Sequence, residues 1–204
     1  ASTDIVNKGA VNQELLGVDI QTAGNLSPMV LKGIKFNMKG CQANVAKLHV
    51  YTSGQKNELT KETSIADIDV TAETAEANIT FARPLELAEG SNYFWLTADI
   101  ADEAATDTDI DAAVTAVTTA TATINVDAEQ GDPEGARTVK NTYNLQAGDN
   151  GEIVVGNEAL MFYDNGGADG KSPKNFEGQV TFRPKDAGKV VKLTFKSFST
   201  SYND

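Results

Sequence analysis

The sequence contains one cysteine, Cys41, and one histidine, His49. A single cysteine cannot form a disulfide within the chain, and a single imidazole excludes most histidine-based catalysis and most zinc sites. No nucleophile motif or phosphate-binding glycine loop accompanies them. These absences predict that the chain is not an enzyme. We expect Cys41 to be a small buried apolar residue at a strand end; the alternatives are a reactive thiol and an intermolecular disulfide.

Basic residues are also few. Lys and Arg number 17 against 29 Asp and Glu, which gives a formal net charge of −12. Nucleic acids and anionic lipid headgroups attract basic surfaces, so we expect neither as a partner. No apolar run approaches the about 20 residues of a membrane-spanning helix, so we expect no transmembrane segment. We expect no signal peptide, because residues 1–3 look like a mature or trimmed start.

Alternation of apolar and polar residues is most distinct over Asn92–Ile100, which predicts a strand. One of its faces is apolar and should lie in a core: Phe94, Leu96, Ala98 and Ile100. The opposite face carries the only tryptophan of the chain: Tyr93, Trp95, Thr97 and Asp99.

Similar short segments recur about every ten residues with turn residues between them, which indicates an antiparallel β-sandwich, jelly-roll-like, over residues 1–127. The other strands that we expect are 14–23, 30–38, 45–52, 77–81, 112–119 and 120–126. The strand 77–81 should end at Arg83-Pro84 because proline cannot donate to a sheet. The remaining predicted core residues are Leu16, Val18, Ile20, Ile34, Phe36, Leu48 and Val50.

Residues 128–139 are poor in apolar side chains and predict a linker. A second strand pattern follows over 140–204, which predicts a second antiparallel β-sandwich module. Its expected strands are 142–145, 152–155, 159–163, 179–183 and 189–198, and its expected core residues are Phe162, Val180, Phe182, Leu193 and Phe195. A sandwich of about seven strands takes about 100 residues, so this module looks incomplete and should leave a strand edge open for self-association.

Tyr93 and Trp95, with His49 and Tyr51 from another strand, form a candidate ligand-binding row. Sugars bind by stacking their apolar C–H face on an aromatic ring, while polar neighbours such as Asp99 bond to the hydroxyls. The alternative is that Trp95 packs under a loop or against the other sheet.

An acidic loop follows the Asn92–Ile100 strand, with carboxylates at Asp99, Asp102, Glu103, Asp107, Asp109 and Asp111. Closely spaced oxygens of this kind are what Ca²⁺ prefers, but the spacing does not match an EF-hand loop. The simpler interpretation is a solvated turn that caps a short helix over 103–105.

The first module resembles a known family through Leu87, Gly90, Asn92–Leu96, Asp99-Ile100 and Ile110–Ala112. Over about residues 4–127 it is similar to the lectin-like accessory domain at the N-terminus of BNR-repeat sialidases, which also occurs in surface proteins of Gram-negative bacteria. The resemblance implies a non-catalytic β-sandwich beside a catalytic or adhesive partner, secreted or at the cell surface.

The second module resembles the front part of a CUB-like domain over about residues 142–204. Met161–Gly167, Val180–Pro184 and Leu193–Phe198 carry this resemblance. Calcium-binding CUB domains use an aspartate at the position of Asp204, and Asp164 and Asp169 could join it; the preceding glutamate of that family is absent here. The alternative for Asp164–Gly167 is a simple turn in which the glycines supply positive φ.

These patterns together predict a non-catalytic accessory module of a bacterial secreted or cell-surface protein that binds carbohydrate or host glycan in adhesion or targeting. The alternative is a structural spacer or interaction module that presents a catalytic or adhesive domain. A glycan or a cell-surface protein is the expected partner. No cofactor is expected apart from the calcium considered above.

Overall fold

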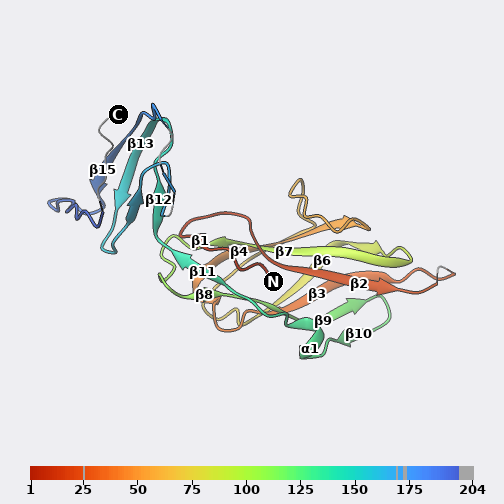
Figure 1. Cartoon of the computed structure of the whole chain (residues 1–204). Helices are drawn as coiled ribbons and strands as arrows, with labels where there is room; N and C mark the ends of the chain where they lie inside the picture. The colour runs from red at the N-terminus through yellow and green to blue at the C-terminus, as the bar shows by residue number, and fades with distance from the viewer. Residues whose placement is uncertain (25, 169, 172–173, 198–204) are drawn as a thin grey trace. The chain divides into compact units, whose positions relative to one another are not determined.

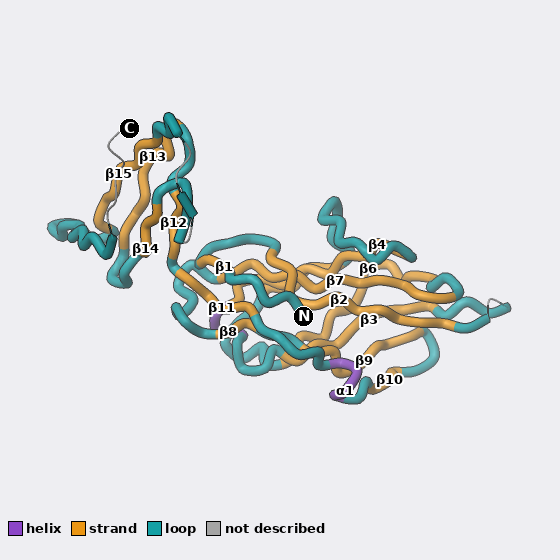
Figure 2. Tube along the Cα trace, viewed as in Figure 1, coloured by secondary structure: helices purple, strands orange, loops and turns teal. Residues whose placement is uncertain are grey.

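The computed structural model describes residues 1–24, 26–168, 170–171 and 174–197 (Figure 1). The chain divides into two compact units, Ala1–Lys140 (unit 1) and Asn141–Asp204 (unit 2), which we describe separately. Among the described residues, helix is confined to η1 (Gln42–Asn44) and α1 (Ala128–Gly131) (Figure 2). The predicted all-β class is therefore confirmed. None of the described helices is long and apolar enough to cross a membrane.

Sheet I of unit 1 has four antiparallel strands in the order β2–β7–β4–β5. Their bounds are β2 (Gln13–Thr22), β7 (Gly90–Ile100), β4 (Val45–Gly54) and β5 (Ala66–Asp69). The strand β7 contains the segment predicted from Asn92 and pairs on both edges, with β2 and β4. Its alternation therefore fixes which side chains of sheet I enter the core.

Sheet II of unit 1 also has four antiparallel strands, in the order β10–β9–β3–β6. Their bounds are β10 (Thr123–Asn125), β9 (Ala113–Thr119), β3 (Val30–Asn37) and β6 (Glu76–Glu86). The prediction that a strand ends at Arg83-Pro84 is wrong, because β6 continues to Glu86. Proline is tolerated there since β6 lies at the edge of the sheet, where its pairing with β3 is irregular between Leu31 and Gly33.

The apolar faces of sheets I and II share one core. Phe81 on β6 and Phe94 on β7 stack with ring centroids 6.3 Å apart. Val18 and Ile20 are half-buried and pack against this core. The other core residues predicted for unit 1 are buried: Leu16, Ile34, Phe36, Leu48, Val50, Phe94, Leu96, Ala98 and Ile100.

A third sheet of unit 1 has the order β1–β11–β8. Its bounds are β1 (Val6–Asn7), β11 (Arg137–Lys140) and β8 (Asp109–Ile110), and β1 pairs with β11 in parallel. The side chain of Val139 is fully buried. Residues 128–139, which the composition indicated as a linker, therefore contain α1 and most of β11 and belong to unit 1.

Arg137 explains why this segment packs despite its few apolar residues. Its side chain is 7% exposed and donates hydrogen bonds to the carbonyl oxygens of Asp4 (2.9 Å), Glu14 (2.8 Å) and Ile5 (3.4 Å). A buried guanidinium is tolerated where its donors are satisfied. These bonds join β11 to the N-terminal segment.

Unit 2 differs from the predicted antiparallel sandwich. Its described strands are β12 (Thr142–Asn144), β13 (Gly148–Val155), β14 (Met161–Tyr163) and β15 (Gly178–Pro184). They form two parallel pairs, β12–β14 and β13–β15. The strand predicted over 189–198 is not found in its described part, 189–197, because no described strand pairs with it; Phe198 lies outside the described residues.

The side chains expected to form the core of unit 2 are partly or largely exposed to solvent. None of its described residues is buried, and Phe182 and Val180 keep an intermediate exposure. Phe162, Leu193 and Phe195 are exposed by 37%, 63% and 75%, so their assignment to a core is wrong. Among the described residues, Phe162 makes an edge contact with Phe182, with centroids 5.2 Å apart, and stacks on Tyr143 at 6.2 Å.

We predict that Arg137→Met destabilises unit 1 by about 2–4 kcal/mol, because three carbonyl acceptors lose a charged donor in a buried site. The matched control is Lys140→Met on the same strand. Lys140 forms an ion pair with Asp107 (Nζ–Oδ1 2.6 Å) between exposed side chains, and its loss should cost less than about 1 kcal/mol. Urea unfolding of both variants measures the difference; equal losses would show that β11 is not anchored through Arg137.

Candidate functional site

The outward face of sheet I brings the four predicted ligand-binding residues together. Tyr93 and Trp95 lie on β7, and His49 and Tyr51 lie on β4. Tyr51 is the register partner of Trp95, and His49 is the partner of Thr97. The four side chains therefore share one face, but their environments differ.

Asn12 covers the half of this face that carries Tyr51 and Thr97. Its side chain donates to the Tyr51 hydroxyl (2.8 Å) and accepts from the Thr97 hydroxyl (2.5 Å), while its backbone nitrogen donates to Asp99 Oδ1 (2.6 Å). Lys61 donates to the Asn12 carbonyl oxygen (2.7 Å). Thr97 is fully buried and Tyr51 is 5% exposed, so the Tyr51 ring has no open face for a ligand.

His49 lies between two carboxylates. Its Nδ1 is 2.7 Å from Asp67 Oδ1, and its Nε2 is 3.2 Å from Asp99 Oδ1. Burial opposes ionisation of Asp67, but the hydrogen bonds from His49 and Ser64 outweigh it and lower the pKa of Asp67. Both ring nitrogens are therefore engaged, and His49 supports the covered half of the face rather than an open site.

The other half of the face is an open groove of about 370 Å³ around Trp95. We call it the Trp95 groove; its lining residues are Ala1, Glu14, Gly17, Val18, Asp19, Asn57, Tyr93 and Trp95. Tyr93 and Trp95 are both half-buried, so each ring keeps an accessible part. The indole Nε1 donates to Ser53 Oγ (2.9 Å), which fixes the orientation of the ring.

Gly17 determines how the indole lies. It is the register partner of Trp95 on β2, and a Cβ atom built at Gly17 would lie 2.9 Å from Trp95 Cζ3 and 3.2 Å from Cε3. The six-membered ring of the indole therefore packs over the β2 backbone, in space that any other residue would fill. The alternation of β7 indicates Trp95 but not Gly17, whose signal in the sequence is a glycine inside a strand pattern.

Asp19 is the polar counterpart of the rings. It is exposed, pairs with Tyr93 in the register, and accepts hydrogen bonds through Oδ2 from Ser91 (3.0 Å) and Gln21 (3.2 Å). These two bonds hold the carboxylate in place and involve only one of its oxygens. Asp19 and Asn57 were not among the predicted site residues because only the pairing of β2 with β7 brings Asp19 beside the aromatic rings.

Of the three predicted calcium ligands, only Asp164 lies in the described part of the chain. Asp169 and Asp204 lie outside the described part of the chain. Asp164 Oδ1 accepts a hydrogen bond from the backbone nitrogen of Gly166 (2.9 Å), and Gly167 N donates to Asp164 O (3.0 Å), which is the turn considered as the alternative. The described residues contain no group of three or more His, Cys, Asp or Glu that could hold a metal ion.

In the acidic loop after β7, the carboxylates bond to separate partners and do not converge on one point. Asp107 pairs with Lys140, Asp109 accepts from Thr138 Oγ1 (2.8 Å), and Asp111 pairs with Lys39 (2.9 Å). The short helix expected over 103–105 is absent; the chain turns there, with the Ala104 nitrogen bonded to Ala101 O.

Cys41 is buried, as expected for a small apolar residue. Its thiol lies 3.2 Å from the Asp111 carbonyl oxygen, and burial raises its pKa. A buried thiol with a raised pKa is a poor nucleophile, which argues against the reactive alternative.

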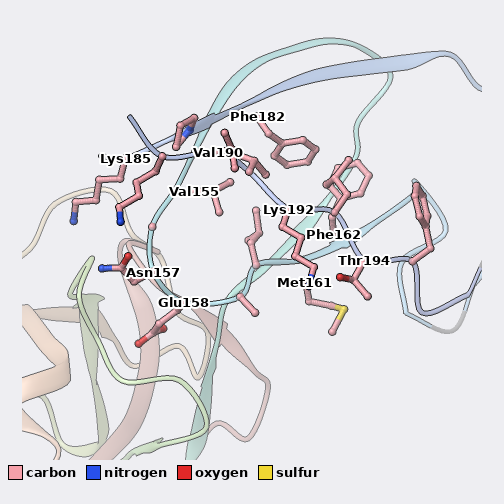
Figure 3. Close-up of a pocket in the computed structure, with 18 of the residues that line it drawn as sticks. Val155, Asn157, Glu158, Met161, Phe162, Phe182, Lys185, Val190, Lys192 and Thr194 are labelled. Carbon is pink, nitrogen blue, oxygen red and sulfur yellow. The ribbon is translucent and has the colours of Figure 1, made fainter. Parts of the chain in front are cut away.

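A second cavity, of about 620 Å³, lies in unit 2 (Figure 3). It opens between residues of β13, β14 and β15 and the segment 189–197, which lies outside the described strands. Phe162, Phe182 and Val190 give it an apolar lining, and Lys185 and Lys192 also line it. Because Val190 is 88% exposed, this cavity is a loosely covered apolar face rather than a preformed site.

We predict that Asn12→Gly lowers the free energy of unfolding of unit 1 by about 1–3 kcal/mol, because two buried hydroxyls lose their partner. Asn12 has a φ of 56°, a conformation that glycine adopts freely. Asn12→Ala should therefore cost about 1 kcal/mol more than Asn12→Gly. Denaturant unfolding measures both; an unchanged stability of Asn12→Gly would show that the covered half does not depend on this side chain.

Comparison with known proteins bears on unit 1. Residues 3–123 match the family model of the N-terminal domain of BNR-repeat neuraminidase, and no curated protein matches the chain. Among solved structures, the chain is similar to "Hadza microbial sialidase Hz136", with a TM-score of 0.50 and 13% identity over 67% of this chain and 30% of that one. At this identity the likeness concerns the fold alone, and the chain spans about a third of that structure's length. Because the family model covers more than half of the residues, the chain belongs to the family of N-terminal domains of BNR-repeat neuraminidases.

Proposed function

We propose that this chain is a non-catalytic accessory module of a secreted or cell-surface sialidase, and that it binds carbohydrate in the Trp95 groove. The observation that carries the proposal is the placement of the indole over Gly17, beside an exposed carboxylate. The family supports the sialidase association, and the groove supports the ligand class.

The Trp95 groove has the two elements that a sugar site needs. A pyranose ring presents an apolar C–H face, which packs on an aromatic ring without displacing tightly held water, and hydroxyls at its edge, which need hydrogen-bond partners. Trp95 and Tyr93 supply the aromatic surface. Asp19 and Asn57 supply polar groups on the same groove. Since Ser53 holds the indole in place, little conformational entropy is lost on binding.

The charges and hydrogen bonds of the groove favour binding over cleavage of a sugar. Its charged side chains that the structure describes are Glu14 and Asp19, and His49 is held between Asp67 and Asp99. Glycoside hydrolysis usually uses two carboxyl groups that flank the scissile bond, one of which acts as the general acid. Asp19 is exposed to solvent and accepts hydrogen bonds from Ser91 and Gln21. Binding without turnover is the function that this arrangement supports.

We predict that Trp95→Ala abolishes glycan binding in an array or calorimetric assay. The stability cost should be about 1–2 kcal/mol, below the about 3–5 kcal/mol of a fully buried aromatic residue, because Trp95 is half-exposed. Phe162→Ala, which truncates an exposed aromatic residue in unit 2, is the control and should retain binding. Loss of binding in the control alone would move the site to unit 2.

A second candidate function is an interaction module that associates through unit 2, whose CUB-like resemblance stays a prediction. The supporting observation is the apolar surface along 189–197, where Val190 and Leu193 are 88% and 63% exposed. Neighbouring exposed apolar side chains of this size favour contact with another protein surface. A second copy of the chain is the partner that can be tested directly.

We predict concentration-dependent self-association of the chain in sedimentation velocity. The double variant Val190→Ser, Leu193→Ser removes apolar surface from unit 2 and changes no residue of unit 1. It should sediment as a monomer. Replacing Leu26 by Ser, an exposed apolar residue of unit 1, is the control and should leave association unchanged. A monomer at all concentrations in the unchanged chain would contradict this candidate function.

A further inference from the structure

We propose that the segment 189–197 of unit 2 pairs edge to edge with the same segment of a second copy, antiparallel and with a two-fold axis at Leu193. The inference rests on the second candidate function, self-association through unit 2, and adds the contact and the register of that association. It follows from the backbone of this segment and from the order of its side chains.

The backbone of residues 190–194 has no partner among the described residues. Between Lys189 and Phe195 the chain forms no described helix, turn, bend or strand. No backbone hydrogen bond of residues 190–194 is found in the described part of the chain, whereas Lys189 N donates to Asp186 O at 3.3 Å. A row of backbone donors and acceptors of this kind is what an added strand binds.

The side chains of the segment alternate as in a strand with one apolar face. We call Val191, Leu193 and Phe195 the apolar row, and Val190, Lys192, Thr194 and Lys196 the mixed row. Leu193 and Phe195 are 63% and 75% exposed, so the apolar row still presents surface to a partner. The apolar row lines the same cavity as Phe162 and Phe182 (Figure 3). Pairing two copies joins their apolar rows into one strip.

The lysines select the register. In an antiparallel pair, an axis at Leu193 places Lys192 opposite Thr194 and Lys196 opposite Val190. An axis at residue 192 places Lys192 opposite its own copy, and an axis at residue 194 places it opposite Lys196. An axis between two residues sets the apolar row of one copy beside the mixed row of the other, because side chains alternate with a period of two. Like charges directly opposite are destabilising, so among the central axes the one at Leu193 alone joins the apolar rows without facing lysines.

Electrostatic repulsion opposes this contact at longer range. Lys189, Lys192 and Lys196 of each copy approach those of the other, and each chain has a formal net charge of −12. Salt screens both repulsions. Raising the salt from about 20 mM to about 500 mM should therefore strengthen self-association. Docking of the lysines on an acidic surface of the second copy would instead be weakened by salt.

The test is disulfide cross-linking of single-cysteine substitutions at a concentration where sedimentation shows association, with oxidised glutathione as the oxidant. The axis at Leu193 places Val191 opposite Phe195, and opposite Cβ atoms in an antiparallel pair lie about 4.5–5.5 Å apart, close to disulfide reach. A mixture of Val191→Cys and Phe195→Cys chains should cross-link, and so should Leu193→Cys alone. Val191→Cys alone and Phe195→Cys alone are the matched controls. Their cysteines would lie four residues out of register, roughly 13 Å apart along the strand, so each should yield several-fold less cross-linked dimer than the mixture. The unchanged chain controls for the buried Cys41.

The outcomes separate the two claims. Self-association that salt weakens, or cross-linking of the mixture no better than that of its two components, overturns the inference and leaves association through unit 2 standing. A monomer at all concentrations and salt levels, with the circular dichroism of a folded β-protein, overturns the second candidate function and the inference with it.

Discussion

Burial of one face of β7 is the constraint on which unit 1 depends. Phe94, Leu96 and Ala98 must face the core, and β7 is held on both edges by β2 and β4, so a one-residue slip would exchange core and solvent side chains along the whole strand. The same constraint determines what the outward face can be. Once the core face is fixed, Tyr93 and Trp95 face outward, and which outward side chains stay accessible depends on how that face is covered.

One half of the outward face of sheet I is covered and the other half is open, because Asn12 and Gly17 have opposite effects on access to it. Asn12, in a left-handed conformation, folds over Thr97 and Tyr51 and removes them from solvent. Gly17, five residues later, has no side chain and leaves room for the indole of Trp95 to pack over the strand. The covered half with Tyr51 and Thr97 and the open Trp95 groove therefore lie on the same sheet face.

Sequence patterns predicted the strands of unit 1 well where the alternation is local, as in β7 and β3. They could not indicate which strands pair, and so they missed Asp19 as a neighbour of Tyr93. They also missed β11, whose stability comes from one buried valine and from the bonds of Arg137 to residues more than 100 positions away. In unit 2, the alternation over 189–198 predicted a strand, but a strand forms only when a partner edge is present.

His49 and Tyr51 show why an outward-facing residue is not yet a binding residue. Alternation placed them correctly on the face of Trp95, since both follow from the register of β4 with β7. Whether such a residue meets a ligand depends on distant segments: Asn12 for Tyr51, and Asp67 on β5 for His49. The period-two pattern specifies the face, and the long-range fold specifies access to it. A strand pattern therefore supports a binding role for a residue only when it is known whether another segment of the chain covers that residue.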